Sequence, residues 1–153
     1  MKLMKVTVFT VIFSVLLMSC NALKTAAFDQ YSYQKSIEIK IEAQKLMEKA
    51  TDDFKNFTEE VEDLQTEVEK MVEYEKYKPN NEVTYKMWQL LSNKDKNLLS
   101  GFFKRWEEEQ QLNSFFVEEA EKIIVEAMDL LIQYESQKDP EVKTKLLDII
   151  SKN

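Results

Sequence analysis

The side chains that most often perform chemistry in proteins are scarce in this sequence. It has no histidine, the usual general base of serine and cysteine nucleophiles and a common zinc ligand. Its single glycine is too few for a glycine-rich phosphate loop. The glutamates 107–109 follow Trp106, but successive helical residues point in different directions, so at most two of them could converge on a substrate. We therefore expect no enzyme activity, no metal and no cofactor, and interpret the acidic runs as solvated helix faces.

The single cysteine, Cys20, follows a segment with the composition of a secretory signal peptide. Lys2 and Lys5 give this segment a positive start, and the apolar run 6–18 is too short to span a bilayer as a helix. Ser19 supplies a small residue at the expected cleavage site. A plain signal peptide with an incidental cysteine and a short buried helix are the alternatives. The order of these features favours an export signal that ends at the cysteine.

The four residues Leu17-Met18-Ser19-Cys20 resemble the lipobox of bacterial lipoproteins. This resemblance implies that residues 1–19 are removed and that acyl chains on Cys20 hold the mature protein on a membrane. Residues 20–28 would then form a short tether, and residues 29–153 a single domain. Asn21 stands where some lipoproteins carry the aspartate that retains them in the inner membrane. The resemblance therefore implies the cell envelope, on the periplasmic face of the outer membrane.

Charge limits the partners of the chain. Its 28 aspartates and glutamates exceed its 21 lysines and arginine, which gives a net charge of −7. An acidic protein repels phosphate backbones, and the basic residues form no stripe, so we expect no nucleic-acid partner.

The scarcity of glycine and proline favours long helices over a sheet. We predict one long N-terminal helix from Asp29 to Lys78, ended by Pro79 and roughly 70 Å long. Residues 37–41 alternate at the strand period, although their neighbours favour helix. Apolar residues at alternating spacings of three and four carry the helix prediction: Met47, Ala50, Phe54, Phe57, Val61, Leu64, Val68 and Met71.

Shorter helices are predicted after Pro79. We expect them over residues 81–91, 95–110 and 114–137, with a last helix opened by Asp139-Pro140. An unbroken helix through Asn113 is the alternative to a new start there. The apolar stripe of the helix 114–137 is too wide for a two-stranded coiled coil. The sequence therefore predicts an all-α fold, an elongated helical bundle in which the long N-terminal helix packs against shorter helices. We favour a monomer and leave homo-oligomers open.

Aromatic residues offer a candidate binding face. Trp88, Phe102, Phe103 and Trp106 lie close in sequence, with the only arginine, Arg105, beside them. Their helical spacing favours a role in the core. Adjacent rings point in different directions, however, so one residue of each pair Phe102/Phe103 and Phe115/Phe116 is a candidate for the surface. Exposed aromatics beside an arginine are typical of interaction hot spots. Tyr31 and Tyr33 follow the tether and would either contact the membrane interface or pack against the bundle end.

These observations favour a lipid-anchored envelope protein that acts by protein–protein interaction, as an adaptor, scaffold or accessory subunit. Its partners would be the membrane, through Cys20, and another envelope protein. A carrier of a small apolar ligand or lipid is an alternative, although the many large side chains favour a filled core. A structural spacer between membrane and cell wall, which would use the long helix, is a further alternative.

Overall fold

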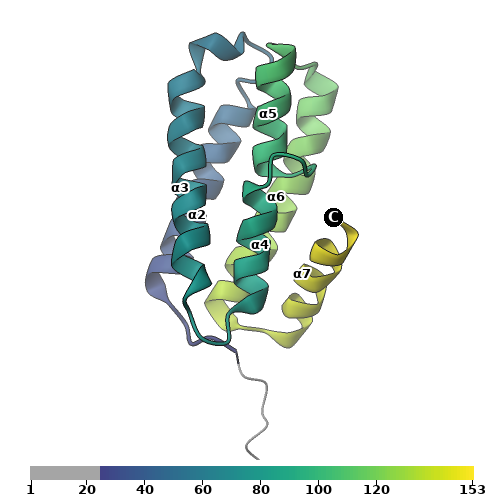
Figure 1. Ribbon diagram of the computed structural model, residues 1–153. Coiled ribbons are helices and arrows are strands. Elements are labelled where there is room, and N and C mark those ends of the chain that lie inside the picture. Colours follow the sequence, from purple (N-terminus) through teal and green to yellow (C-terminus); the bar gives the residue numbers. More distant parts are fainter. Residues whose placement is uncertain (1–24) are drawn as a thin grey trace, which may run out of the picture.

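The computed structural model describes residues 25–153, which are helical without any strand (Figure 1). The all-α bundle predicted from the sequence is confirmed for this part of the chain. Cys20 and the leader before it lie outside the described residues. The elements are α2 (Gln30–Met47), a 3-10 helix η2 (Phe54–Asn56), α3 (Thr58–Lys76), α4 (Glu82–Ser92), α5 (Leu99–Glu109), α6 (Ser114–Gln137) and α7 (Pro140–Lys152).

The helices alternate in direction along the length of the bundle (Figure 1). We call the end at which residue 25 joins the bundle the entry end, and the opposite end the far end. α2 runs to the far end, α3 returns, α4 and α5 run outward in succession, and α6 returns. α7 then packs against α4 and α6 over the half nearer the entry end. The amide of Ala26 donates to the carbonyl of Asn80 at 2.9 Å, so contacts with the bundle already begin inside the segment 20–28 expected as a tether.

The predicted continuous helix from residue 29 to 78 is wrong: the chain folds back between Met47 and Thr58. Asp53 caps η2 by accepting from the amide of Lys55 at 3.1 Å. The backbone of this turn also pairs with the loop that follows α5. The amide of Phe54 donates to the carbonyl of Gln110 at 2.8 Å, and that of Leu112 donates to the carbonyl of Ala50 at 2.8 Å. Folding back lets α2 and α3 bury their apolar stripes against one another and the rest of the bundle.

The ambiguous stretch of isoleucines in α2 is helical. Ile39, Ala43 and Met47 are buried at the helical spacing of four, whereas Ile41 is 45% exposed.

The break before α6 lies at the predicted position, whereas α5 begins later than predicted. Gln110 has a φ of 64°, and the Asn113 side chain accepts from the amide of Phe116 at 2.8 Å, so the helix does break before α6. α5 begins at Leu99 rather than residue 95. The Asn93 side chain accepts from the amide of Asp95 at 2.8 Å and holds the preceding residues in a turn.

Large side chains fill the core. Trp88 and Trp106 are fully buried, and Phe103 is 1% exposed. Near the far end the indole of Trp106 donates to the carbonyl of Asp52 at 3.0 Å, and its ring lies 5.3 Å from that of Phe54 in an edge-to-face arrangement.

Candidate functional site

The candidate binding residues divide between core and surface. Trp88, Phe102, Phe103 and Trp106 are at most 3% exposed, so they form no exposed aromatic patch. Of the five candidates only Arg105 is exposed.

The expectation that one residue of each adjacent aromatic pair faces outward holds for one pair only. Phe115 is 74% exposed and Phe116 is half-buried. Phe102 and Phe103 are both buried, because α5 is covered on two sides. Phe102 stacks on Phe116 of α6 with ring centroids 6.0 Å apart, while Phe103 lies 6.4 Å from the ring of Trp106.

Arg105 lies at the rim of a small pocket between α5 and α6. Its guanidinium carbon is 4.1 Å from the ring centroid of Phe116, and its Nε is 2.7 Å from Oε1 of Glu109. The pocket has a volume of about 170 Å³, and Phe102 and Ile123 line it. Glu107 and Glu108 point into solvent nearby.

A second cleft of about 710 Å³ adjoins this pocket between α6 and α7. Both clefts are lined by Asn97 and Ile123, and the larger one continues along Leu130 and Ile149. Ile123 is 57% exposed at the point where they meet. We call the two clefts together the α6 groove. Its walls are apolar side chains of α6, and charged side chains of α7 line its edge.

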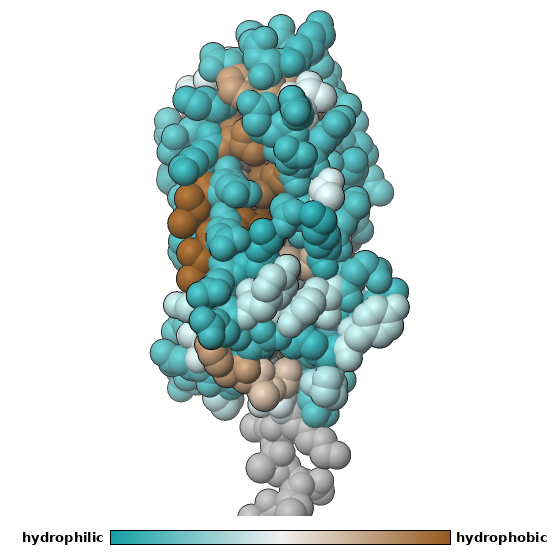
Figure 2. Space-filling model, turned by 90° about the vertical axis from the view of Figure 1, so that its left-hand side faces the viewer, coloured by the Kyte–Doolittle hydropathy of each residue, from teal (hydrophilic) through white to brown (hydrophobic). Residues whose placement is uncertain are grey.

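Another cleft of about 670 Å³ lies between α2 and α3, and its character is different. Leu46 and Leu64 form its floor, but charged side chains surround them, including the ion pair between Lys35 and Glu67 at 2.7 Å. Figure 2 shows this side of the molecule, where hydrophilic side chains dominate and hydrophobic ones are visible in a hollow and along one edge.

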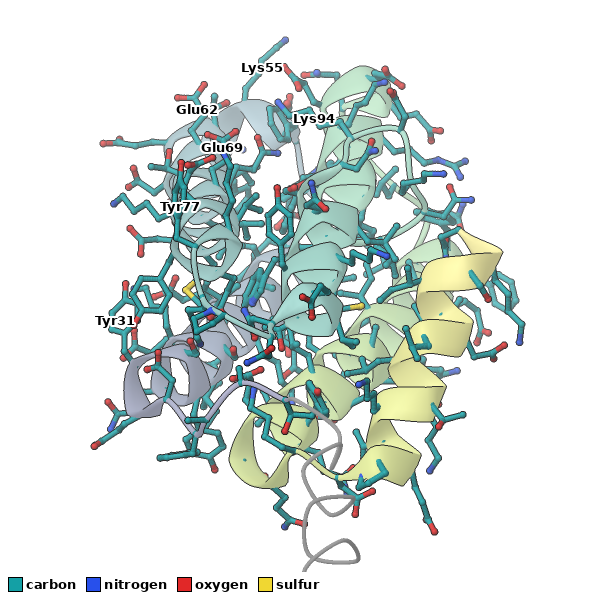
Figure 3. The ribbon with its side chains drawn as sticks, turned by 60° about the horizontal axis from the view of Figure 1, so that its bottom comes forward. Tyr31, Lys55, Glu62, Glu69, Tyr77 and Lys94 are labelled. Atoms are coloured by element: carbon teal, nitrogen blue, oxygen red, sulfur yellow. The ribbon has the colours of Figure 1, made fainter. Side chains whose placement is uncertain are left out.

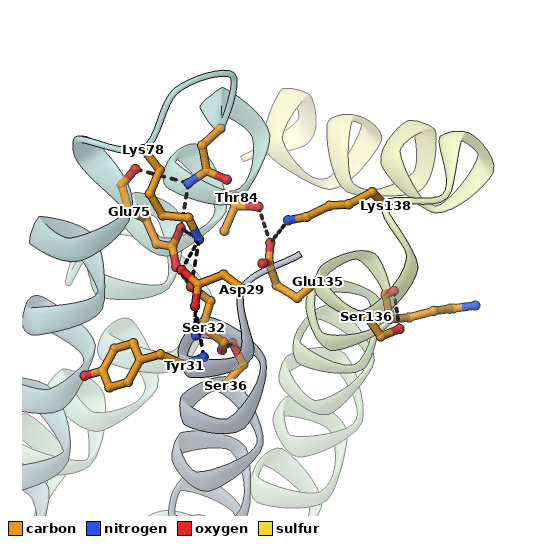
Figure 4. A network of polar contacts seen from close by, with 12 residues as sticks. Asp29, Tyr31, Ser32, Ser36, Glu75, Lys78, Thr84, Glu135, Ser136 and Lys138 are labelled. Carbon is orange, nitrogen blue, oxygen red and sulfur yellow. Dashed lines mark hydrogen bonds and ion pairs between the residues drawn. The ribbon is translucent and has the colours of Figure 1, made fainter. Parts of the chain in front are cut away.

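The most organised polar chemistry lies at the entry end (Figure 4). Asp29 caps α2 by accepting from the amides of Tyr31 (2.9 Å) and Ser32 (3.2 Å). Its other oxygen accepts from the hydroxyl of Tyr74 at 2.8 Å and lies 3.2 Å from Nζ of Lys78. Burial opposes ionisation of this carboxyl, but these hydrogen bonds outweigh it and hold the pKa of Asp29 below its usual value.

Two fully buried carboxylates extend this network. Glu75 accepts from Nδ2 of Asn81 at 2.6 Å and from the Ser32 hydroxyl, and its Oε2 lies 2.9 Å from Nζ of Lys78. Burial favours the neutral amine, yet Glu75 and the other surrounding acids raise the pKa of Lys78 above its usual value.

Glu135 of α6 is the second buried carboxylate. It accepts from the hydroxyl of Thr84 at 2.5 Å, and Nζ of Lys138 is 2.6 Å away. The two carboxylate clusters thus tie α2, α3, α4 and α6 together near the entry end (Figure 4). Among residues 25–153 no group of three or more aspartates, glutamates, cysteines or histidines could hold a metal ion.

All six tyrosines of the chain lie near the entry end, within about one helical turn of a helix terminus there. The rings of Tyr31 and Tyr74 are in contact at a tilted angle with centroids 4.7 Å apart, and the ring of Phe28 lies 6.1 Å from that of Tyr33. Tyr31 and Tyr77 lie on one side near this end, whereas Lys55 and Glu62 lie toward the far end (Figure 3). The tyrosines are Tyr31, Tyr33, Tyr74, Tyr77, Tyr85 and Tyr134.

Only two of these tyrosines, Tyr31 and Tyr33, and neither buried glutamate stood out as candidate site residues from the sequence alone. A signal existed for both groups. Tyr74, Tyr77, Tyr85 and Tyr134 all lie within a few residues of the predicted breaks at Pro79 and Pro140. Glu75 and Glu135 stand four residues after Met71 and Leu131, at positions where each apolar stripe would continue.

No protein-family model, curated protein or solved structure matches this chain. In the described part of the chain, no helix is both long enough and apolar enough to cross a bilayer.

Proposed function

We propose that this protein is a lipid-anchored envelope protein that binds another protein along the α6 groove and has no catalytic role. The lipobox-like segment that ends at Cys20 supports the anchor, and its sequence context supports the outer membrane as the location. The groove is the observation that carries the binding function.

The groove suits the apolar face of a partner helix. Phe116, Ile123 and Leu130 lie on one side of α6 at spacings of seven, which is the repeat that a packed helix follows. α7 already packs against α6 over the half of the bundle nearer the entry end, and the groove continues beyond it toward α5. A partner helix would extend this packing and cover Ile123.

The alternatives receive less support. Binding pockets for small molecules usually enclose about 300 to 1,000 Å³, whereas the pocket between α5 and α6 holds about 170 Å³ and the larger clefts lie open between helices. The spacer hypothesis depended on one helix of roughly 70 Å, and the turn at residues 48–57 removes that helix.

Site-specific photo-crosslinking in intact cells tests the binding face. A photoreactive residue replaces Ile123 in the groove or, as a matched control, Ile41, which is 45% exposed on α2. We expect one dominant protein adduct from position 123 that is absent from position 41. The same adducts from both positions would contradict binding at the groove. Changes at Trp106 or Phe103 are unsuitable tests, because both side chains are buried and their loss would unfold the protein.

A further inference from the structure

We propose that the entry end is a lipid-contact surface, in which exposed tyrosines and Phe28 immerse in the headgroup layer of the membrane that carries the anchor. The inference rests on the proposed acylation of Cys20. It adds that the bundle meets the bilayer with one defined end, and that this end itself binds lipid.

The aromatic residues at the entry end are exposed despite the free energy available from burying them. Phe28 is 57% exposed, Tyr31 48%, Tyr74 41% and Tyr77 77%. A tyrosine ring has an apolar body and a polar hydroxyl, and this combination is favoured at membrane–water interfaces. The backbone positions that carry these rings lie within about one helical turn, or roughly 5 Å, of a helix terminus at this end, which is comparable with the thickness of the headgroup layer of one leaflet.

Three chain segments form this end, and two of them carry few free charges. The third lies where α6 is joined to α7 and contains Lys138, Asp139 and Glu141. The segment 26–28 is Ala-Ala-Phe, and the residues 77–81 contain one charged side chain, Lys78. Lys78 is already held by Asp29 and Glu75, so its charge is neutralised within the protein. Figure 2 shows hydrophobic surface at the bottom of this end, beside the point of chain entry. Removing water from these two segments therefore costs little.

The polar network holds the rings in place. Tyr74 donates its hydroxyl to Asp29, which also caps the helix that carries Tyr31. The Lys76 ammonium lies 5.3 Å from the ring centroid of Tyr77, and the Lys78 ammonium 5.5 Å from that of Tyr74. Because these contacts order the rings before binding, little conformational entropy is lost when lipid surrounds them.

The position of the anchor places this end at the bilayer. Residues 20–25 span at most about 3.5 Å each, so Thr25 lies within roughly 20 Å of the acylated sulfur. Ala26 is fixed to Asn80 by its hydrogen bond, so the entry end itself cannot lie far from the membrane. The far end, which carries Lys55 and Glu62, would point away from the membrane (Figure 3).

Fluorescence of the acylated full chain on phosphatidylcholine vesicles tests the inference. Pro79→Cys adds an exposed thiol at the entry end, and an environment-sensitive fluorophore attached there leaves every tyrosine in place. Acylation of Cys20 leaves the new thiol as the only reactive one. We expect a blue-shifted emission and at least roughly threefold protection from a water-soluble quencher on vesicles, relative to the same label at Lys94→Cys.

Two further variants separate lipid contact from mere proximity. Tyr31→Ser with Tyr77→Ser should abolish the protection at residue 79, whereas Phe115→Ser, which removes an exposed ring at the far end, should leave it unchanged. Tyr77→Ser alone should lower the protection, and its 77% exposure makes a folding defect unlikely to confuse the result. Protection that survives loss of both tyrosines would overturn the inference, because the tether alone would then explain it. Absence of protection in a chain that Cys20 retains on vesicles would overturn the inference and leave the anchor intact, while equal retention of Cys20→Ser would contradict the anchor itself.

Discussion

Glu75, Glu135 and Lys78 show how individual polar residues specify the packing of the entry end. Both glutamates occupy positions where their helices would otherwise continue an apolar stripe, and both are fully buried. A buried carboxylate is tolerated only when cations and hydrogen-bond donors surround it. Lys78 and Asn81 from the loop after α3 meet this requirement for Glu75. Lys138 and Thr84 meet it for one oxygen of Glu135, Oε1, while its Oε2 is buried without a hydrogen-bond partner.

Lys78→Met should lower the free energy of unfolding by roughly 3 kcal/mol, because it leaves Glu75 buried without its cation. Lys152→Met is the matched control. Lys152 pairs with Asp148 on the surface at 2.5 Å, and the loss of such a pair costs less than about 1 kcal/mol. Urea unfolding of the two variants measures the difference. Equal losses would mean that the buried network does not hold the entry end together.

The lowered pKa of Asp29 predicts a pH dependence of stability. A carboxyl whose pKa is lower in the folded state stabilises the fold above its unfolded value, near 3.8, and loses this contribution as the pH falls through the folded value. Asp29→Asn keeps a capping side chain but removes the charge. We expect the variant to melt at a lower temperature than the wild type at pH 7, with the difference shrinking as the pH falls below about 4. A difference that is constant from pH 7 to pH 3 would contradict this origin.

At the scale of elements, the turn between α2 and α3 is the feature that most changes the expected shape. The apolar positions predicted for one long helix are buried, including Ala50 and Phe54 inside the turn, except that Phe57 is only partly buried. The alternation of three- and four-residue spacings continues through the turn, because the apolar residues of the turn are buried in the core just as they would be on one face of a continuous helix. The turn is stabilised by backbone hydrogen bonds to the loop that follows α5, which lies more than fifty residues later in the sequence. Local pattern carries no information on such a contact.

Distance measurement between spin labels distinguishes the two shapes. Glu38→Cys and Lys70→Cys place labels on exposed positions of α2 and α3. Neighbouring helices pack about 8 to 10 Å apart, so the labels should be separated by less than about 25 Å. One continuous helix over residues 38–70 would separate them by about 48 Å, and that result would contradict the hairpin.

Gly101 fixes the start of α5. A Cβ atom at this position would lie 1.7 Å from the carbonyl oxygen of Lys96, so the backbone of the preceding turn approaches too closely for any side chain. Gly101→Ala should therefore cost about 1 to 3 kcal/mol by forcing these segments apart, although alanine is the better helix former. Lys86→Ala on the exposed face of α4 should change stability by less than about 0.5 kcal/mol. Thermal melts of the two variants test this, and a neutral or stabilising Gly101→Ala would contradict the close approach.

The sequence predicted the helices best where caps and apolar period agree, as in α6 and α7. Asn113 and Asp139 accept hydrogen bonds from the first-turn amides of these two helices. Exposure was harder to predict, because it depends on which faces neighbouring helices cover. Phe102 and Phe103 are both buried although they are adjacent, and the exposed ring of the other pair is Phe115. The candidate groove around Ile123 likewise arises only when α5, α6 and α7 come together.

For the whole molecule, the arrangement of aromatic residues is polarised. Tyrosines gather at the entry end, while buried phenylalanines and Trp106 fill the far end. The α6 groove runs along the side between them. In the proposed account, the first surface meets lipid and the second meets a protein partner, so the bundle holds that partner at a fixed distance from the membrane. The lipid contact and the fixed distance from the membrane both depend on the modification of Cys20.

That modification is tested most directly by the intact mass and the N-terminal peptide mass of the protein purified from the cells that produce it. The account predicts a chain that begins at Cys20 and carries the added mass of acyl chains on that residue. A precursor that retains Met1, or a mature chain cut elsewhere with an unmodified Cys20, would contradict it.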